Sequence, residues 1–266
     1  MPTYTELDKL HRNIKGKVFL IKDVLAGQDE FVCLKRDVEC KVKKAYKLCL
    51  SESKLGLRAT YYVQHSLFKK EKNVAYLKKM QALGADICYH HDVMDSNGGD
   101  VEKALLDFEN KLNDFSSSGF CTATVCQHGN PIANRVGYTS NRDFFRNETV
   151  CKKYPEIVDV VVNMSQKTGT YTYISDHRYK WKEILDPEKD DSESKELENL
   201  SQVIAMTNEK KRVIISVHTH RLNANKFTEK LSSIKFNFIR RTARLLMRIP
   251  FLKKFMARHY YLARKV

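Results

Sequence analysis

The chain has 266 residues, and its 47 lysines and arginines against 32 aspartates and glutamates give a net charge of +15. Hydrophobic residues make up 42% of the chain, with 10 glycines and 5 prolines, which excludes a collagen-like or wholly disordered protein. Seven cysteines without a CxxC pair favour buried thiols in a reducing compartment over a disulfide framework or a zinc cluster.

Residues 1–30 form a lead-in with one strand-like segment at 17–21. No apolar segment typical of a secretion signal stands near residue 1, and no run reaches the roughly 18 apolar residues of a membrane span. We therefore expect a soluble, cytoplasmic protein.

From residue 31 onward, strand-like and helix-like segments alternate at a spacing of about 30 residues. Apolar residues recur at helical spacing in the helix-like segments, and β-branched or aromatic residues fill the strand-like ones. The alternation predicts βα units around a parallel sheet or barrel. The predicted strands are 31–39, 57–64, 85–91 and 121–129, and the predicted helices are 41–56, 73–84 and 100–115.

The pattern is less regular after residue 130. Strands are predicted at 156–164, 170–176 and 212–220. The segment 186–198 is strongly acidic, and we expect a solvated loop that leads into a helix. These boundaries predict one domain over residues 31–233.

Carboxylates and imidazoles gather where the predicted strands end. In parallel α/β folds the carboxyl ends of the strands meet at one edge, which is where sites form. Carboxylate oxygens with imidazole nitrogens suit zinc or another divalent first-row ion, and such an ion can activate water for hydrolysis. By themselves these residues predict a metal-assisted hydrolase. They are Asp37, Glu39, His90, His91, Asp92, His128, Asp176, His218 and His220.

Five sequence elements, in order over residues 31–222, resemble the motifs of polysaccharide-deacetylase-like proteins. These proteins form the NodB-type superfamily, related to carbohydrate esterase family 4, and the resemblance is to the branch associated with bacterial surface-polysaccharide synthesis. The elements are LKRDVE with LGLRATYYV (34–39 and 55–63), GADICYHHDV (84–93), VCQHGNP (125–131), YISDHRYKW (173–181) and IISVHTHR (214–221).

The resemblance implies a distorted (β/α) barrel of about seven strands and metal-dependent removal of an acetyl group from an N-acetylated sugar. By position in the motifs, it makes Asp37 the general base and His218 the general acid or a partner of the oxyanion. It assigns the metal to Glu39 and His90, with His128 as a further metal ligand or a substrate contact. Zinc is expected first, with cobalt, nickel or iron as alternatives. The expected partner is a sugar or a precursor of a surface glycan.

Three further residues are assigned to substrate binding: Arg36, Asp176 and Trp181. For Trp181, packing in the core is the favoured alternative. The chain also departs from the family pattern, with Arg36 in place of a histidine and Glu39 in place of an aspartate. In addition, Met94 stands where a second metal histidine falls. These departures leave open a catalytically degenerate, glycan-binding protein of a polysaccharide-synthesis complex.

The last segment, residues 234–266, is called the basic tail here. Its residues 235–266 carry ten positive charges and no acidic residue, interleaved with apolar side chains, and Pro250 splits the segment into two predicted helices. Such a basic amphipathic segment can lie on an anionic membrane surface, dock on the domain or a partner, or bind nucleic acid. Nucleic acid is the least favoured of the three. The first alternative predicts a protein peripheral to the inner face of the cell membrane.

Overall fold

The computed structural model describes residues 2–120, 122–130, 133–177, 180–224, 227–228, 234 and 242. Its strands are β1 (Val18–Phe19), β2 (Phe31–Val38), β3 (Thr60–Val63), β4 (Asp86–His91), β5 (Thr124–Gln127), β6 (Val158–Asp159), β7 (Thr172–Ser175), β8 (Lys182–Ile184), β9 (Ser194–Glu196) and β10 (Arg212–His218). Its helices are α1 (Tyr4–Arg12), α2 (Ile21–Val24), α3 (Val42–Lys54), η1 (His65–Lys69), α4 (Glu71–Ala82), α5 (Val93–Ser96), α6 (Val101–Ser117), α7 (Asp143–Arg146), α8 (Glu148–Lys153), α9 (Ser165–Thr168), α10 (Leu200–Glu209) and η3 (Thr219–Arg221).

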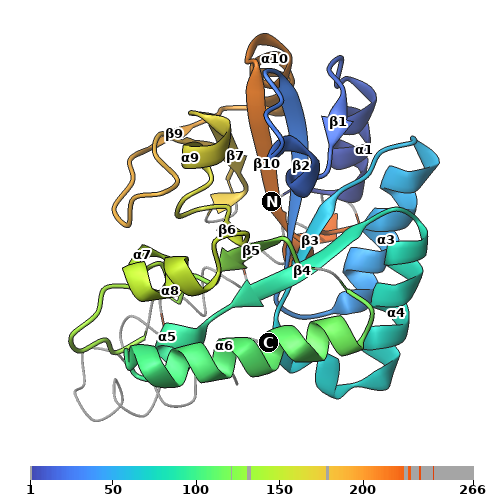
Figure 1. The fold of residues 1–266 in the computed structure, drawn as a ribbon. Helices are drawn as coiled ribbons and strands as arrows, with labels where there is room; N and C mark the ends of the chain where they lie inside the picture. Colours follow the sequence, from blue (N-terminus) through green and yellow to red (C-terminus); the bar gives the residue numbers. More distant parts are fainter. Residues whose placement is uncertain are drawn as a thin grey trace.

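The strands form one sheet in the order β6-β5-β4-β3-β2-β10-β7-β8-β9, with β1 beside β2. The first seven strands in this order, which run from β6 through β2 and β10 to β7, pair in parallel. Strands β8 and β9 extend the sheet as antiparallel strands. The chain reaches β10 last, yet β10 lies between β2 and β7 (Figure 1). The first and last long strands of the chain are therefore neighbours.

The sheet curves, and each face buries its own apolar cluster. Along β2, Phe31 and Cys33 belong to the inner cluster, whereas Val32 and Leu34 belong to the outer cluster, because successive side chains of a strand point to opposite faces. The outer cluster packs against α3, α4 and α6, which cover the strands in Figure 1. The inner cluster joins residues from β6 round to β7, namely Val158, Cys126, Cys88, Tyr62, Cys33, Ile214 and Tyr173.

A hydrogen bond links the two ends of the parallel part of the sheet. The Tyr171 hydroxyl, next to β7, donates to the Val160 carbonyl, next to β6, over 2.6 Å. The seven parallel strands thus curl round a shared interior without closing a continuous ladder. This confirms the predicted fold, a distorted (β/α) barrel of about seven strands with mixed α/β composition.

Local signals explain the helix boundaries. Helix α3 ends where Gly56 adopts a φ of +69° and the Leu57 N–H donates back to the Glu52 carbonyl over 3.0 Å. Helix α6 begins at Asp100, whose carboxylate accepts the Lys103 N–H over 3.1 Å. The predicted helices over 41–56 and 100–115 are confirmed within two residues.

One prediction about the later segments is wrong, and another is confirmed only in part. The strand expected over 156–164 is only Val158–Asp159, because the Asp159 carboxylate accepts the Val161 N–H over 2.9 Å and turns the chain. The acidic segment 186–198 is largely exposed and leads into α10, as predicted, but it contains β9, and its Asp190 pairs with Arg142 and Arg146. The acidic charge is thus partly neutralised by arginines of the preceding segment.

The predicted basic tail lies outside the described residues, apart from Ile234 and Thr242. Within the described part of the chain, no helix has the length and apolar character needed to cross a membrane.

Candidate active site

Three side chains meet at the carboxyl end of the parallel strands. The Glu39, His90 and His128 side chains each offer one ligand atom, and these atoms lie within 4.8 Å of one another. Glu39 directly follows β2, His90 lies in β4, and His128 directly follows β5. Strands β4 and β5 are neighbours, and β3 lies between β4 and β2, so one side of the barrel contributes all three residues. The distance from His128 Nε2 to Glu39 Oε1 is 3.5 Å.

The ring of His90 is oriented by the backbone. Its Nδ1–H donates to the Cys126 carbonyl over 2.9 Å, so its lone pair lies on Nε2. Burial lowers the pKa of His90 to about 4, which keeps the ring neutral at physiological pH. A neutral, backbone-oriented imidazole is the form that binds a metal ion.

Glu39 is ionised despite its burial. Burial disfavours its charge, but the neighbouring His128 and His218 outweigh this effect and hold the pKa of Glu39 well below its usual range. Its side chain keeps 16% of its surface exposed, and that of His218 keeps 18%, so the cluster can be reached from solvent.

The donor set fits a divalent metal ion. Two imidazoles and one carboxylate are the ligands of many catalytic zinc sites, which keep a further position for water or substrate. A second group of potential ligands, Asp37, His90 and Cys126, also lies together. It fits less well, because Lys35 binds both oxygens of Asp37 and burial raises the pKa of the Cys126 thiol.

Asp37 lies beside this cluster and forms an ion pair inside the barrel. The Lys35 ammonium is 2.5 Å and 2.7 Å from its two carboxylate oxygens. Burial opposes the charge, but Lys35 outweighs it and lowers the pKa of Asp37 to about 2. Asp37 is therefore ionised at physiological pH. Lys35 is not among the site residues predicted from the sequence, although it stands two residues before Asp37 and so faces the same side of the strand.

His218 faces Asp37 and Glu39 from β10. Its Nε2 is 3.8 Å from Asp37 Oδ2 and 3.8 Å from Glu39 Oε1. Its Nδ1–H donates to Asp176 Oδ1 over 2.6 Å, and its backbone N–H donates to Asp176 Oδ2 over 3.2 Å. Asp176 therefore fixes the orientation of the His218 ring.

Two of the residues assigned to substrate binding have other contacts. Asp176 is fully buried and both of its oxygens are engaged by His218, so the expectation of a direct sugar contact is wrong. Trp181 is partly buried and packs against the outer apolar cluster, as in the alternative favoured for it.

The expectation that Arg36 contacts substrate is also wrong. Arg36 is fully buried on the outer face of β2, because the alternation of the strand turns it away from Asp37. Its guanidinium donates to Glu52 over 2.8 Å and to the carbonyls of Lys35 and Ile215 over 3.1 Å each. Glu52 also accepts the Tyr61 hydroxyl over 2.5 Å. Arg36 is thus a structural residue.

Within the part of the chain that the structure describes, neither Met94 nor Asp95 takes the place of the histidine that the family motif has at position 94. Met94 is buried in the outer apolar cluster. The nearby Asp95 carboxylate is bound by Arg135 over 2.8 Å and 3.0 Å, and by Tyr138 and Asn141. Asn141 also donates to the His128 carbonyl over 2.8 Å. Asp95 therefore holds the loop that carries His128 and offers no ligand of its own.

No family model and no curated protein match this chain. Two solved structures are similar to it. A CE4 esterase from Streptococcus mutans has 10% sequence identity and a TM-score of 0.46, covering 92% of this chain and 90% of that one. The peptidoglycan deacetylase PdaC from Bacillus subtilis, in a mutant form, has 12% identity and a TM-score of 0.40, covering 71% of this chain and 74% of that one.

Proposed function

We propose that the chain is a metal-dependent hydrolase that removes the acetyl group from an N-acetylated sugar. The observation that carries the proposal is the convergence of Glu39, His90 and His128 beside Asp37 and His218 at the carboxyl end of the barrel. In the proposal Glu39, His90 and His128 hold a divalent ion, zinc in the first instance. A bound ion of this kind supplies Lewis-acid polarisation of the acetyl carbonyl and a lowered pKa for water.

The residues of the chain account for the proton transfers. Asp37, kept ionised by Lys35, accepts a proton from the water that attacks the acetyl carbonyl carbon. As the C–O bond forms and the C–N bond breaks, protonated His218 gives its Nε2 proton to the departing nitrogen. The products are acetate and a free amine on the sugar. Asp176 holds His218 in the tautomer that presents Nε2 to the reacting groups.

A second candidate function is binding of the same sugar without hydrolysis. The observation that favours it is the close contact of Lys35 with both oxygens of Asp37, because a carboxylate with a pKa of about 2 is a weak base. Under this alternative the chain serves a glycan-assembly complex as a binding module. The substrate class in both cases is a precursor of a surface glycan. As part of the same proposal, the basic tail binds the inner surface of the cell membrane.

Metal content of protein purified without chelator tests the proposal. We expect near-stoichiometric zinc, or cobalt, nickel or iron, in the unaltered chain. The content should fall at least about tenfold in Glu39→Ala and in His90→Ala, since each removes one ligand. His65→Ala is the matched control, because His65 is paired with Asp114 and does not belong to the cluster of potential ligands.

Acetate release from N-acetylated sugars then separates the two candidates. Turnover that is lost in Asp37→Asn supports hydrolysis, whereas saturable sugar binding without acetate release supports the binding module. Protein that stays empty when offered these metals, or variants that keep the ion, would contradict the metal site.

A further inference from the structure

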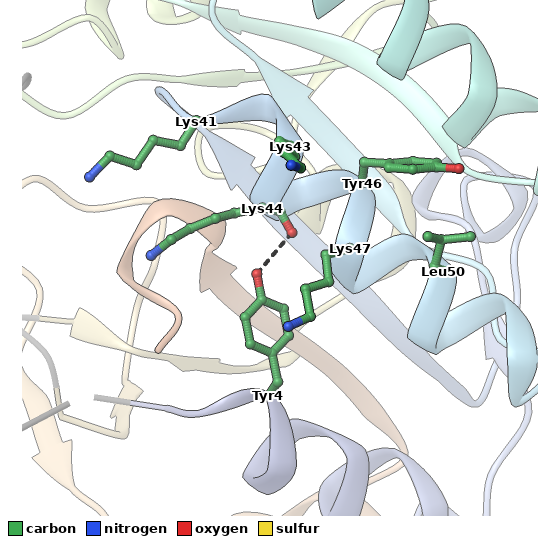
Figure 2. Close-up of a pocket in the computed structure, with 7 residues that line it drawn as sticks. All are labelled: Tyr4, Lys41, Lys43, Lys44, Tyr46, Lys47 and Leu50. Atoms are coloured by element: carbon green, nitrogen blue, oxygen red, sulfur yellow. Dashed lines mark hydrogen bonds between the residues drawn. The ribbon is translucent and has the colours of Figure 1, made fainter. Parts of the chain in front are cut away.

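A lysine-rich pocket lies on the outer surface where α1 meets the start of α3. The pocket has a volume of about 460 Å³, and carbon atoms form almost all of its wall. These atoms belong to four lysines, two tyrosines and one leucine: Lys41, Lys43, Lys44, Lys47, Tyr4, Tyr46 and Leu50. Figure 2 shows these side chains around the first turns of α3, with Tyr4 contributed by α1. We call it the lysine pocket.

Three of these lysines hold charge that the protein does not neutralise. Lys41, Lys43 and Lys47 are exposed, and no ion pair joins any of them to a carboxylate in the described part of the chain. The Lys47 ammonium lies 4.6 Å from the centre of the Tyr4 ring, and the Tyr4 hydroxyl donates to the Lys44 carbonyl over 3.1 Å. The lysine pocket therefore has an apolar, partly aromatic wall, and the lysines whose stems form this wall carry unpaired ammonium groups.

The lysine pocket is joined to the candidate active site on both sides. Lys41 follows Glu39 by two residues, so their Cα atoms are at most about 7 Å apart. Lys44 donates to the carbonyls of His220 and Leu222 over 3.0 Å and 2.5 Å, directly after His218. The ring of His220 lies 6.0 Å from that of His218. The lysine pocket and the candidate active site are therefore neighbours at the same edge of the barrel.

We propose that the lysine pocket binds a phosphate group carried by the substrate, so that the acetylated sugar is a sugar phosphate or diphosphate. This inference rests on the proposed function. A phosphate carries between one and two negative charges and three acceptor oxygens, which several lysines can share, whereas a single carboxylate satisfies fewer of them. The phosphate sits next to Tyr4 and Lys41, and the acetyl group reaches the cluster of Glu39 and His218.

The test compares two substrates that differ in one phosphate. N-acetylglucosamine 1-phosphate and methyl N-acetylglucosaminide are offered to the full chain and to the triple variant Lys41→Ala, Lys43→Ala, Lys47→Ala. We expect the ratio of kcat/KM for the phosphorylated over the neutral sugar to fall about tenfold in this variant. Lys44 is left in place, because it holds the segment after His218.

A second triple variant controls for total charge. This variant, Lys15→Ala, Lys17→Ala, Lys210→Ala, removes three exposed lysines that precede β1 and β10. The ratio of the two kcat/KM values should change less than about twofold in it. A ratio that is unchanged in the pocket variant, or that falls equally in both variants, overturns the proposal. The same comparison is made with an N-acetylglucosamine that carries a carboxylate in place of the phosphate. If the pocket variant loses as much kcat/KM for this sugar as for the phosphorylated one, phosphate is not the group that the pocket recognises.

Two further measurements separate this proposal from the proposed function. Calorimetric binding of N-acetylglucosamine 1-phosphate requires no turnover, so a loss confined to the pocket variant supports the lysine pocket even if no acetate is released. Uridine-diphosphate-linked and short-prenyl-diphosphate-linked N-acetylglucosamine then distinguish a nucleotide from a lipid as the phosphate source. A preference for either over the methyl glycoside supports the proposal, and equal use of all three overturns it.

Discussion

The charged groups on the two faces of β2 differ in how they are paired. On the outer face every nitrogen of Arg36 has a partner, because Glu52, His11 and two backbone carbonyls surround its guanidinium. On the inner face Asp37 and Glu39 lie near ligand atoms and imidazoles that converge on one place. The charged group of the outer face is fully paired within the protein, whereas the groups of the inner face converge on a place that can hold a ligand. Burial alone therefore does not distinguish a structural charge from a functional one.

The largest expected effect comes from the inner face. Asp37→Asn should lower acetate release by a factor of about 10² to 10⁴, because it removes the proton acceptor. It should also destabilise the fold by about 3–5 kcal/mol, since Lys35 is then a buried charge without its partner.

The double variant Lys35→Met, Asp37→Leu separates these two effects. Denaturant unfolding should show recovered stability, because both charges are gone, while acetate release stays lost. Full activity in Asp37→Asn would show that Asp37 serves only as the partner of Lys35.

On the outer face, removal of one partner should affect stability and leave the metal site in place. Arg36→Ala should lower the free energy of unfolding by about 3–5 kcal/mol, because Glu52 stays buried with its charge uncompensated. Denaturant titration measures the loss, and Arg58→Ala is the control, since its exposed pair with Asp23 is worth at most about 1 kcal/mol. An Arg36→Ala protein that folds normally but loses its metal would break the distinction between the two faces.

The smallest expected effect is a pH dependence of the outer group. Burial, with a smaller contribution from Arg36, lowers the pKa of His11 to about 3. The unfolded chain binds a proton at His11 below about pH 6.5, and the folded chain does not until about pH 3. Stability should therefore fall by about 2 kcal/mol from this group between pH 7 and pH 5. His11→Gln should remove this part of the slope, and an unchanged slope would contradict the assignment.

The sequence predicted the inner face well, because its signal is local to each strand. Carboxylates and imidazoles stand at the ends of β2, β4, β5 and β10, and parallel strands bring such ends to one edge. The structure brings Asp37, Glu39, His90, His128 and His218 together as that rule requires. Their roles in catalysis remain predictions.

The failures of prediction concern which face a residue occupies. Arg36 was assigned from its place in a motif, although the alternation of β2 already separates it from Asp37. The same alternation would have found Lys35. The part played by Asp176 could not be predicted, because it depends on the register that puts it beside His218 in another strand. The shortened β6 depends on a side-chain bond of Asp159 that competes with the ladder.

The position of β10 between β2 and β7 has a consequence for how the protein is made. Asp37 and His218 are paired in register across β2 and β10, yet most of the chain separates them in sequence. During synthesis β2 can pair with β3 early, but its other edge stays open until β10 has left the ribosome. An open strand edge invites pairing with other chains, so the nascent protein is exposed to aggregation for most of its synthesis. A premature stop before residue 212 would remove both the general acid and the strand that covers this edge.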